Sequence, residues 1–184
     1  MNNNYLNENL ITLNNMKKLD DIYKKVLKDV IECLNKGNKL IFIGNGGSAT
    51  DSSHIVSEFV AHFKLGRKSL PAISLTDNNA LLTSISNDYS YDDVFKKQLE
   101  SLGSDGDILF GITTSGKTKN VLEALSFAKT IGIKPILVTG NNVTDIEYSI
   151  KIPSSDTSII QNMYMFLFHM LCLDVDEYYN KHRN

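Results

Sequence analysis

Leu40-Ile41-Phe42-Ile43-Gly44-Asn45-Gly46-Gly47-Ser48 is the stretch that decides the fold of this 184-residue chain. Its first five residues form a short apolar run that ends in turn residues, which predicts a buried strand. The glycines then predict a tight turn, and residues 50–64, where apolar side chains recur one helical turn apart, predict a helix. A strand, a glycine-rich loop and a helix in this order open an α/β unit.

The rest of the chain repeats this alternation of strand and helix signals. Further strands are predicted at residues 72–77, 108–114, 135–140 and 148–153. Helices are predicted at residues 19–34, 93–102, 121–128 and 157–179. Because strands that alternate with helices form parallel sheets, we predict an α/β fold. It is a doubly wound, five-stranded parallel sheet flanked by helices, of the flavodoxin-like type.

Length and composition fit one globular domain. With 42% hydrophobic and 22% charged residues, the chain is long enough to bury its own core, so residues 1–184 are predicted to form a single domain. A net charge of -2 provides no positive field for a nucleic acid, which we do not expect as a partner. Cys33 and Cys172 lie in no metal-binding or disulfide pattern and are expected to be buried thiols in a reducing cytoplasm.

The two ends of the chain carry further signals. Residues 2–15 are rich in Asn and lack an export signal, and we expect this start to fray before its helix begins. Residues 1–37 are predicted to form a helical segment that packs on the core or on a neighbouring subunit. The longest apolar run, Met163–Leu173, is too short to span a membrane, which needs about 20 residues. Its helix is apolar on every face, which favours an oligomer.

Two loops are suited to bind phosphate. Gly44–Ser48 and Thr113–Thr118 each follow a predicted strand and precede a predicted helix, where backbone N–H groups and hydroxyls can hold an anion. Tight turns with N-capping would give the same pattern. Residues 44–49 also fit the dinucleotide pattern G-x-G-x-x-A, but the acidic residue expected about 20 positions later is missing. We also take a Walker loop to be excluded, because no Gly-Lys-Ser/Thr ends the first loop. A small phosphorylated ligand fits best.

Four polar side chains stand out on the predicted helices. His54 and Glu58 are four residues apart, so they share a helix face near the first loop. Such a pair can chelate zinc, and a carboxylate near a sugar carbonyl can act as a general base; an exposed helix pair is the alternative. Gln161 and His169 lie in the apolar last helix, with Cα atoms about 12 Å apart, where buried polar groups need partners. A core histidine bonded to a backbone carbonyl is the alternative there.

Together these residues resemble the SIS (sugar isomerase) domain family, and most closely its sedoheptulose 7-phosphate isomerases, the phosphoheptose isomerases. The resemblance covers about residues 38–180 and implies a homotetramer with active sites at subunit contacts and a phosphorylated sugar as substrate. It rests on these stretches: Gly44–Ser48, Asp51 followed by His54 and Glu58, Ser86-Asn87-Asp88, Thr113–Gly116, and Gln161 with His169.

The resemblance also implies a role for each matching residue. Glu58 and His169 match the catalytic base and acid. One zinc ion per subunit would be held by His54, Glu58, Gln161 and His169. The implied substrate-binding residues are Asn45, Gly46, Gly47, Ser48, Asp77, Asn87, Asp88, Thr113, Thr114, Ser115, Thr118 and Gln161.

The implied reaction converts D-sedoheptulose 7-phosphate to D-glycero-D-manno-heptose 7-phosphate through a cis-enediol, the first step toward ADP- or GDP-heptose. The glycan that receives the heptose, lipopolysaccharide, capsule or S-layer, stays open. The alternative is a non-catalytic SIS protein that binds sugar phosphate as a sensor or serves as a tetrameric scaffold. The chain departs from the family pattern at His62 and Ile159, where Arg is usual, and at Asn162 and Tyr164, where Glu and His are usual.

Overall fold

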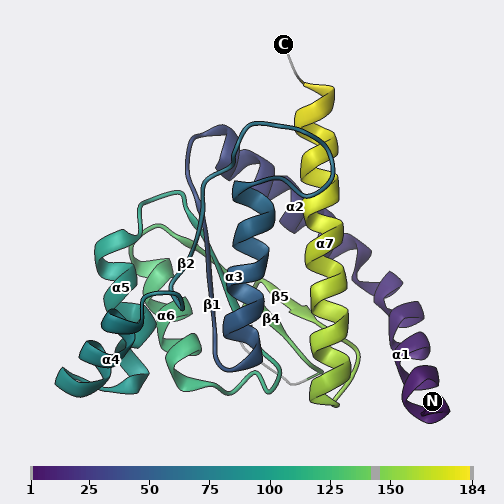
Figure 1. The fold of residues 1–184 in the computed structure, drawn as a ribbon, viewed down its shortest axis with the longest axis horizontal. Coiled ribbons are helices and arrows are strands. Elements are labelled where there is room, and N and C mark those ends of the chain that lie inside the picture. Colours follow the sequence, from purple (N-terminus) through teal and green to yellow (C-terminus); the bar gives the residue numbers. More distant parts are fainter. Residues whose placement is uncertain (1, 142–145, 183–184) are drawn as a thin grey trace.

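The computed structural model describes residues 2–141 and 146–182. Within them, one sheet of five parallel strands has the order β2-β1-β3-β4-β5 (Figure 1). The strands are β1 (Leu40–Gly44), β2 (Ala72–Ser74), β3 (Ile108–Thr113), β4 (Lys134–Thr139) and β5 (Ser149–Lys151). The predicted doubly wound parallel sheet is confirmed.

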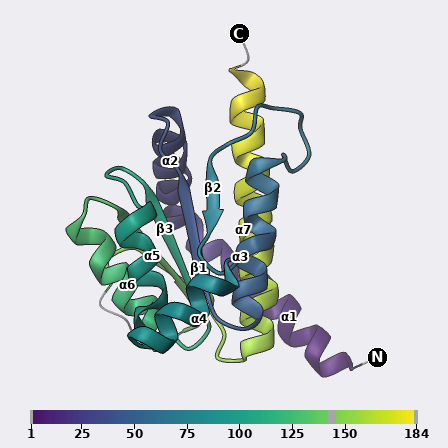
Figure 2. The same cartoon turned by 60° about the vertical axis from the view of Figure 1, so that its left-hand side comes forward.

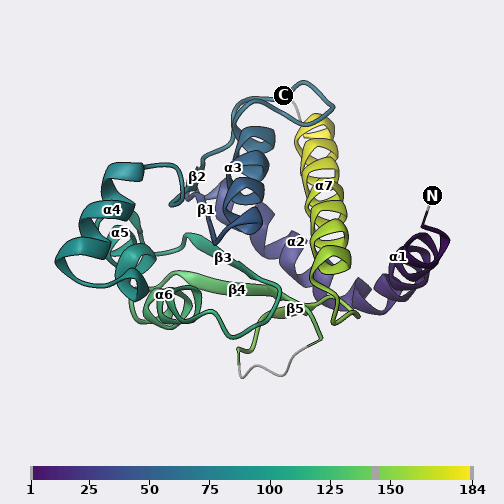
Figure 3. The same cartoon turned by 60° about the horizontal axis from the view of Figure 1, so that its bottom comes forward.

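Helices cover both faces of the sheet (Figure 2). They are α1 (Asn3–Asn15), α2 (Asp20–Asn35), α3 (Gly47–Val60), α4 (Asn79–Asp88), α5 (Val94–Leu102), α6 (Lys119–Thr130) and α7 (Thr157–Lys181), with the short 3-10 helices η1 (Met16–Leu19) and η2 (Tyr91–Asp93). α2, α3 and α7 pack on one face, and α4, α5 and α6 on the other. α1 extends outward from the body of the fold and contacts α7 (Figures 1 and 3).

The order of the strands places the two glycine- and hydroxyl-containing loops side by side. The chain leaves β1 for β2 on one side and returns to β3 on the other, so the strand order reverses between β1 and β3. Gly44 at the end of β1 pairs with Ile112 near the end of β3. The loop after β1 leads to α3 on one face, and the loop after β3 leads to α6 on the opposite face. This reversal point is where open α/β sheets bind ligands.

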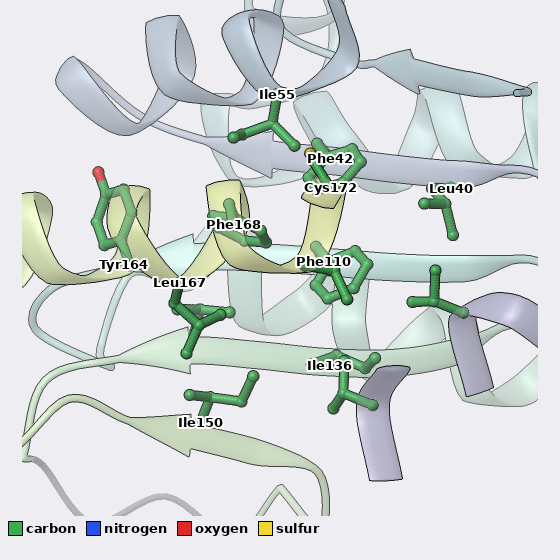
Figure 4. Close-up of a cluster of buried hydrophobic side chains, with 14 of the residues drawn as sticks. Leu40, Phe42, Ile55, Phe110, Ile136, Ile150, Tyr164, Leu167, Phe168 and Cys172 are labelled. Atoms are coloured by element: carbon green, nitrogen blue, oxygen red, sulfur yellow. The ribbon is translucent and has the colours of Figure 1, made fainter. Parts of the chain in front are cut away.

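An aromatic cluster fixes α7 over the centre of the sheet (Figure 4). The rings of Phe42 in β1 and Phe110 in β3 stack with centroids 4.9 Å apart. Phe168 of α7 meets them edge-on at 5.7 and 5.6 Å, and all three side chains are fully buried. Each such aromatic pair contributes about 0.5–1.5 kcal/mol to stability, beyond the contribution from the burial of its surface area. By length and composition α7 could cross a membrane, but half of its most apolar window is buried inside the fold, where it serves as a core helix.

The helix predicted at residues 50–64 differs from the observed α3, which begins at Gly47 and ends at Val60. His62 follows with φ of 138°, outside helical space. The next three N–H groups, of residues 63–65, donate to one carboxylate oxygen of Asp176 instead of to helix carbonyls. A carboxylate that accepts three amides replaces the predicted last turn with a loop.

Other bounds also differ from prediction. Residues 79–88 form α4, which the sequence did not predict, and the Asn78 side chain caps it by accepting from the N–H of Leu81. The Asn-rich start does not fray as expected: Asn2 caps α1, which begins at Asn3. Asn162 of α7 donates 2.9 Å hydrogen bonds to the Tyr5 hydroxyl and to Asn9, which anchors that helix.

The strands are shorter than predicted at the edges of the sheet. β2 ends at Ser74 and not at residue 77, and β5 covers three residues and not 148–153. Inside the sheet the differences are small: β3 ends one residue early, and β4 has the predicted length but lies one residue earlier. β2 and β5 each have one neighbouring strand, so fewer ladder hydrogen bonds extend them.

A buried ion pair joins the end of α3 to α7. Arg67 Nε lies 2.5 Å from Asp176 Oδ1, and both side chains are at most 1% exposed. The remaining guanidinium nitrogens donate to the carbonyls of Glu58 and Phe59, at 3.0 and 2.8 Å, near the end of α3. Together with the three amides on its other oxygen, Asp176 is fully hydrogen-bonded, which a buried charge requires.

We expect Asp176→Ala to lower the free energy of unfolding by about 3–5 kcal/mol, because it leaves the buried Arg67 unpaired. Urea denaturation followed by circular dichroism measures this. The matched control is Asp20→Ala, which breaks the exposed Lys24–Asp20 pair and should lower the free energy of unfolding far less than Asp176→Ala does. Similar small losses in both variants would contradict the role given to Asp176.

Candidate active site

The first loop turns sharply because of its glycines. Gly46 has φ of +58°, a conformation that side chains other than glycine rarely adopt. A Cβ at position 47 would lie only 2.6 Å from Nε2 of Gln161, so glycine lets the loop meet α7 closely. Ser48 occupies the first turn of α3 and is 5% exposed. The loop therefore presents backbone N–H groups at the start of a helix, next to Gln161, as an anion site requires.

A hydroxyl network ties this loop to α7. The Tyr164 hydroxyl donates to Asp51 at 2.5 Å and lies 3.0 Å from Ser48 Oγ. Burial and the Asp51 carboxylate raise the pKa of Tyr164, so the phenol keeps its proton. Tyr164 stands where the family pattern has His, and in this chain it holds the first residues of α3 against α7.

The second loop is lined by hydroxyls. Thr113 Oγ1 lies 2.6 Å from Thr118 Oγ1 and 3.3 Å from Ser115 Oγ. Ser115 accepts from the N–H of Lys117, and its side chain is exposed at the surface of the loop. The carbonyl of Thr114 accepts from the N–H of Gly140, which joins the loop to the end of β4. This arrangement adds a second set of hydroxyls at the same edge of the sheet as the first loop.

Residues 111–118 match the Walker pattern G-x-x-x-x-G-K-T, so the exclusion of a Walker loop held for the first loop only. The structure explains why the match has no such meaning. Gly111 lies inside β3, where a Cβ would come within 2.8 Å of Val121 and Leu125, and α6 begins only at Lys119. The initial glycine of the pattern is therefore a packing residue of the strand.

Two residues at this edge of the sheet, Asn120 and Tyr91, were not predicted from the sequence. The Asn45 side chain donates to buried Asn120 at 2.8 Å and accepts from the Tyr91 hydroxyl at 2.7 Å. Asn120 lies in the first turn of α6, and Tyr91 belongs to η2. Asn120 follows the hydroxyl-rich second loop by two residues, and this position could have indicated that its side chain belongs to the site. No local pattern marks Tyr91, because its partner is 46 residues away.

The acid–base candidates converge between α3 and α7. His54 Nε2 lies 3.2 Å from Glu58 Oε1, and the His54 ring meets the His169 ring edge-on with centroids 5.4 Å apart. The Phe63 ring stacks on His169 at 5.1 Å with an interplanar angle of 8°. The predicted sharing of one helix face by His54 and Glu58 thus brings both next to His169.

His169 is electrostatically perturbed. Burial of the ring lowers its pKa, the neighbouring His54 lowers it further, and the Glu58 carboxylate opposes this shift. Burial disfavours the charged form, so the ring is neutral at neutral pH and gives up a proton readily when it is charged. Such a ring suits proton transfer.

A groove brings the two polar residues of α7 together. Although they are eight residues apart, Gln161 and His169 line the same groove, along with Gly47, Asp51, Asn162, Met165 and Phe166. Asp77 accepts a hydrogen bond from Ser53, which lies midway along α3. Asn87 and Asp88 are exposed in the last turn of α4 and bond to each other. Among the described residues, no hydrogen bond ties this last pair to either loop.

The predicted zinc ligands fit the metal in their donor chemistry. His54, Glu58, Gln161 and His169 offer two imidazoles, one carboxylate and one amide oxygen, which are donors that zinc accepts. Within residues 2–141 and 146–182, however, no three His, Cys, Asp or Glu side chains are grouped as a ready metal site. His54 and Glu58 form the nearest pair.

Two anion-type loops at the reversal point of a five-stranded parallel sheet, with an acid–base cluster beside them, define the class of sugar-phosphate-binding SIS domains. The SIS domain family matches residues 4–140. The chain is 47% identical over 160 residues to a probable phosphoheptose isomerase of Thermoplasma volcanium, across 85% of this chain and 82% of that protein. It is 44% identical to the phosphoheptose isomerase of Thermodesulfovibrio yellowstonii, across 85% and 80%.

Solved structures agree with these sequence comparisons. The phosphoheptose isomerase of Francisella tularensis matches with a TM-score of 0.89 and 30% identity, across 95% of this chain and 96% of that one. The enzyme of Neisseria gonorrhoeae matches with a TM-score of 0.86 and 31% identity, across 94% and 95%. The chain belongs to the phosphoheptose isomerase family of SIS domain proteins.

Proposed function

We propose that this protein is an aldose–ketose isomerase that converts D-sedoheptulose 7-phosphate to D-glycero-D-manno-heptose 7-phosphate. The convergence of Glu58, His54 and His169 beside two anion-type loops carries this proposal. Family membership supports the choice of a heptose phosphate. Incubation of the purified protein with sedoheptulose 7-phosphate, followed by detection of an aldose heptose phosphate, tests it directly.

The proposed site residues form two groups, one that binds the substrate and one that transfers protons. Ser48, Thr113, Ser115 and Thr118 bind the phosphate, so that binding energy far from the reacting carbons holds them in place. The substrate-chain ligands we propose are Asn45, Asp77, Asn87 and Asp88. Within this set, Asn45 is already oriented by Asn120 and Tyr91.

Proton transfer takes place between α3 and α7, where Glu58, His54 and His169 meet. Glu58 takes the proton from C1, which leaves a cis-enediolate with its charge on O2. The hydroxyl proton of O1 passes to O2, and His169 delivers a proton to C2, so that the carbonyl forms at C1. Exchange with water then resets both side chains. Because its lowered pKa keeps the His169 ring neutral at neutral pH, the ring first takes a proton from water, and the charged ring then gives that proton up readily. The Glu58 carboxylate, which is about one-fifth exposed, keeps access to the solvent for the exchange.

We also propose one zinc ion per subunit, held by His54, Glu58, Gln161 and His169. Bound there, zinc would polarise or orient the substrate oxygens at C1 and C2. The proposal rests on the donor chemistry of these side chains and on the 3.2 Å approach of His54 to Glu58. Metal analysis of the purified wild type and of His54→Ala measures the zinc content per subunit. Equal zinc content in both proteins would reject His54 as a ligand.

The rival function is a non-catalytic SIS protein, a sugar-phosphate sensor or a protein-binding scaffold. A scaffold needs the fold and an interface but neither Glu58 nor His169. The placement of these two side chains around His54, with the His169 ring stacked on Phe63, favours the enzyme. The turnover assay separates the two functions.

We further propose that the protein works in the cytoplasm as a homotetramer. The support is an apolar surface on α1 and α7, which we call the α1–α7 patch. It consists of Leu6, Leu10, Ile11, Phe166 and Met170, which are 38–60% exposed in the single subunit. A second copy of the chain would bury this surface, as the family resemblance implies. Fractionation of cells that produce the protein tests its location.

We expect Glu58→Gln and His169→Gln each to lower kcat about 10²- to 10⁴-fold, because each removes a proton-transfer group. Steady-state kinetics measures the loss. Glu177→Gln and His182→Gln change the same residue types near the end of α7, at the partly exposed Glu177 and the exposed His182, and should turn over normally. Near-normal kcat in either active-site variant would reject its assignment.

Ser115→Ala should raise the Kd for inorganic phosphate and the KM for substrate by about ten-fold or more, because it removes a hydroxyl donor to a charged acceptor. Isothermal calorimetry measures the Kd. Ser101→Ala removes a hydroxyl from an exposed residue of α5 and serves as the control. Unchanged affinity in Ser115→Ala would place the phosphate elsewhere.

Phe166→Asp should dissociate the assembly and abolish activity together, because it places a charge in the α1–α7 patch. Light scattering reports the mass and circular dichroism reports the folding. The control is Leu102→Asp, which charges a similarly exposed apolar residue on α5, away from the patch. A wild type that is an active, folded monomer would refute the assembly.

A further inference from the structure

We propose that Phe63 is the positioning residue that fixes the imidazole of His169 for proton transfer. This inference rests on the proposed isomerase function and extends it to a residue outside the predicted site. Phe63 lies in the loop after α3, so nothing in its sequence position marks it as part of the site.

The contact itself is specific. The two rings are nearly parallel, at 8°, with centroids 5.1 Å apart. The His54 ring meets His169 edge-on at 69°, so one aromatic face and one aromatic edge fix the plane of the imidazole. Aromatic contacts of this kind favour defined ring geometries over free rotation. A catalytic group that is held in one plane needs no reorientation before it reacts.

The backbone of Phe63 is itself fixed by a hydrogen bond to α7. Its N–H donates to Asp176 Oδ2, as do those of Lys64 and Leu65, and the other oxygen of Asp176 pairs with buried Arg67. Asp176 lies seven residues after His169, two turns along the same helix. One helix thus carries both the imidazole and the carboxylate that anchors the ring stacked on it. The position of the Phe63 ring is therefore set by α7 and not by the loop alone.

The same ion pair also reaches Glu58. Arg67 donates to the carbonyls of Glu58 and Phe59, so the last turn of α3 and the Phe63 loop are bound to one guanidinium. The positions of Glu58, the base candidate, and of the stacked Phe63 ring therefore both depend on the buried Arg67–Asp176 pair. Loss of the Phe63 ring would free the imidazole while it leaves the Arg67–Asp176 pair intact, because that pair contacts only the backbone N–H of Phe63.

Phe63→Leu is expected to lower kcat about ten- to hundred-fold with KM within about two-fold, because substrate binding is kept and only the ring orientation is lost. Phe63→Tyr keeps an aromatic face and should retain wild-type kcat. The matched control is Phe127→Leu: Phe127 is also half-buried and also has a Lys ammonium over its ring, but it lies on α6.

Proton NMR of the four histidines supplies a readout that does not depend on turnover. The His169 ring signals, assigned with His169→Gln, should be shifted by the Phe63 ring in the wild type and in Phe63→Tyr, and the shift should be lost in Phe63→Leu. An unshifted His169 in the wild type, or unchanged kcat in Phe63→Leu after the shift is lost, would overturn the inference. If the wild type shows the shift but does not turn over sedoheptulose 7-phosphate, the proposed function fails, and the positioning role fails with it.

Discussion

The buried Arg67–Asp176 pair is the interaction on which the geometry of the site depends. Its two side chains are almost completely shielded from water, so the charges are stable only because each polar atom has a partner. Those partners are the last carbonyls of α3 and the first amides of the following loop. The requirement to satisfy one buried pair therefore dictates where α3 ends, how the chain turns, and how α3 lies against α7.

Tyr164 performs the corresponding task at the opposite end of the two helices. Its ring lies in the cluster around Phe168 while its hydroxyl points away from that cluster (Figure 4), toward Ser48 and Asp51 at the start of α3. α3 and α7 lie side by side in Figures 1 and 3 and are bonded at both ends. Glu58 and His169 lie between these two attachments. Their approach is thus set by polar contacts on either side and not by a bond between them.

The sheet and its two loops could be predicted because their signals are local. The run Leu40–Gly44 and the glycines after it encode a strand and a turn within nine residues. The convergence of Glu58 with His169 could not be read in this way, since it depends on Arg67 meeting Asp176, 109 residues away. The same cause explains the error at residues 61–64, where helical periodicity continues but Asp176 supplies a stronger competing acceptor. Asp176 is one of three acidic residues near the end of α7, with Asp174 and Glu177, so its sequence position did not mark it as the one that needs a buried partner.

Phe166 connects the proposed assembly to the candidate site through α7. Successive residues of a helix point about 100° apart, so this helix presents different faces to the sheet, to the groove and to α1. Phe166 lines the groove beside Gln161 and His169, and it also lines an apolar hollow between α7 and the segment that joins α1 to α2. A subunit that covers the α1–α7 patch would therefore also contact the rim of the groove. Closure of the groove from that side would exclude water, which would strengthen the electrostatic contacts of the proposed acid–base pair. Phe166 borders both surfaces, so it would couple them on binding of a second copy of the chain.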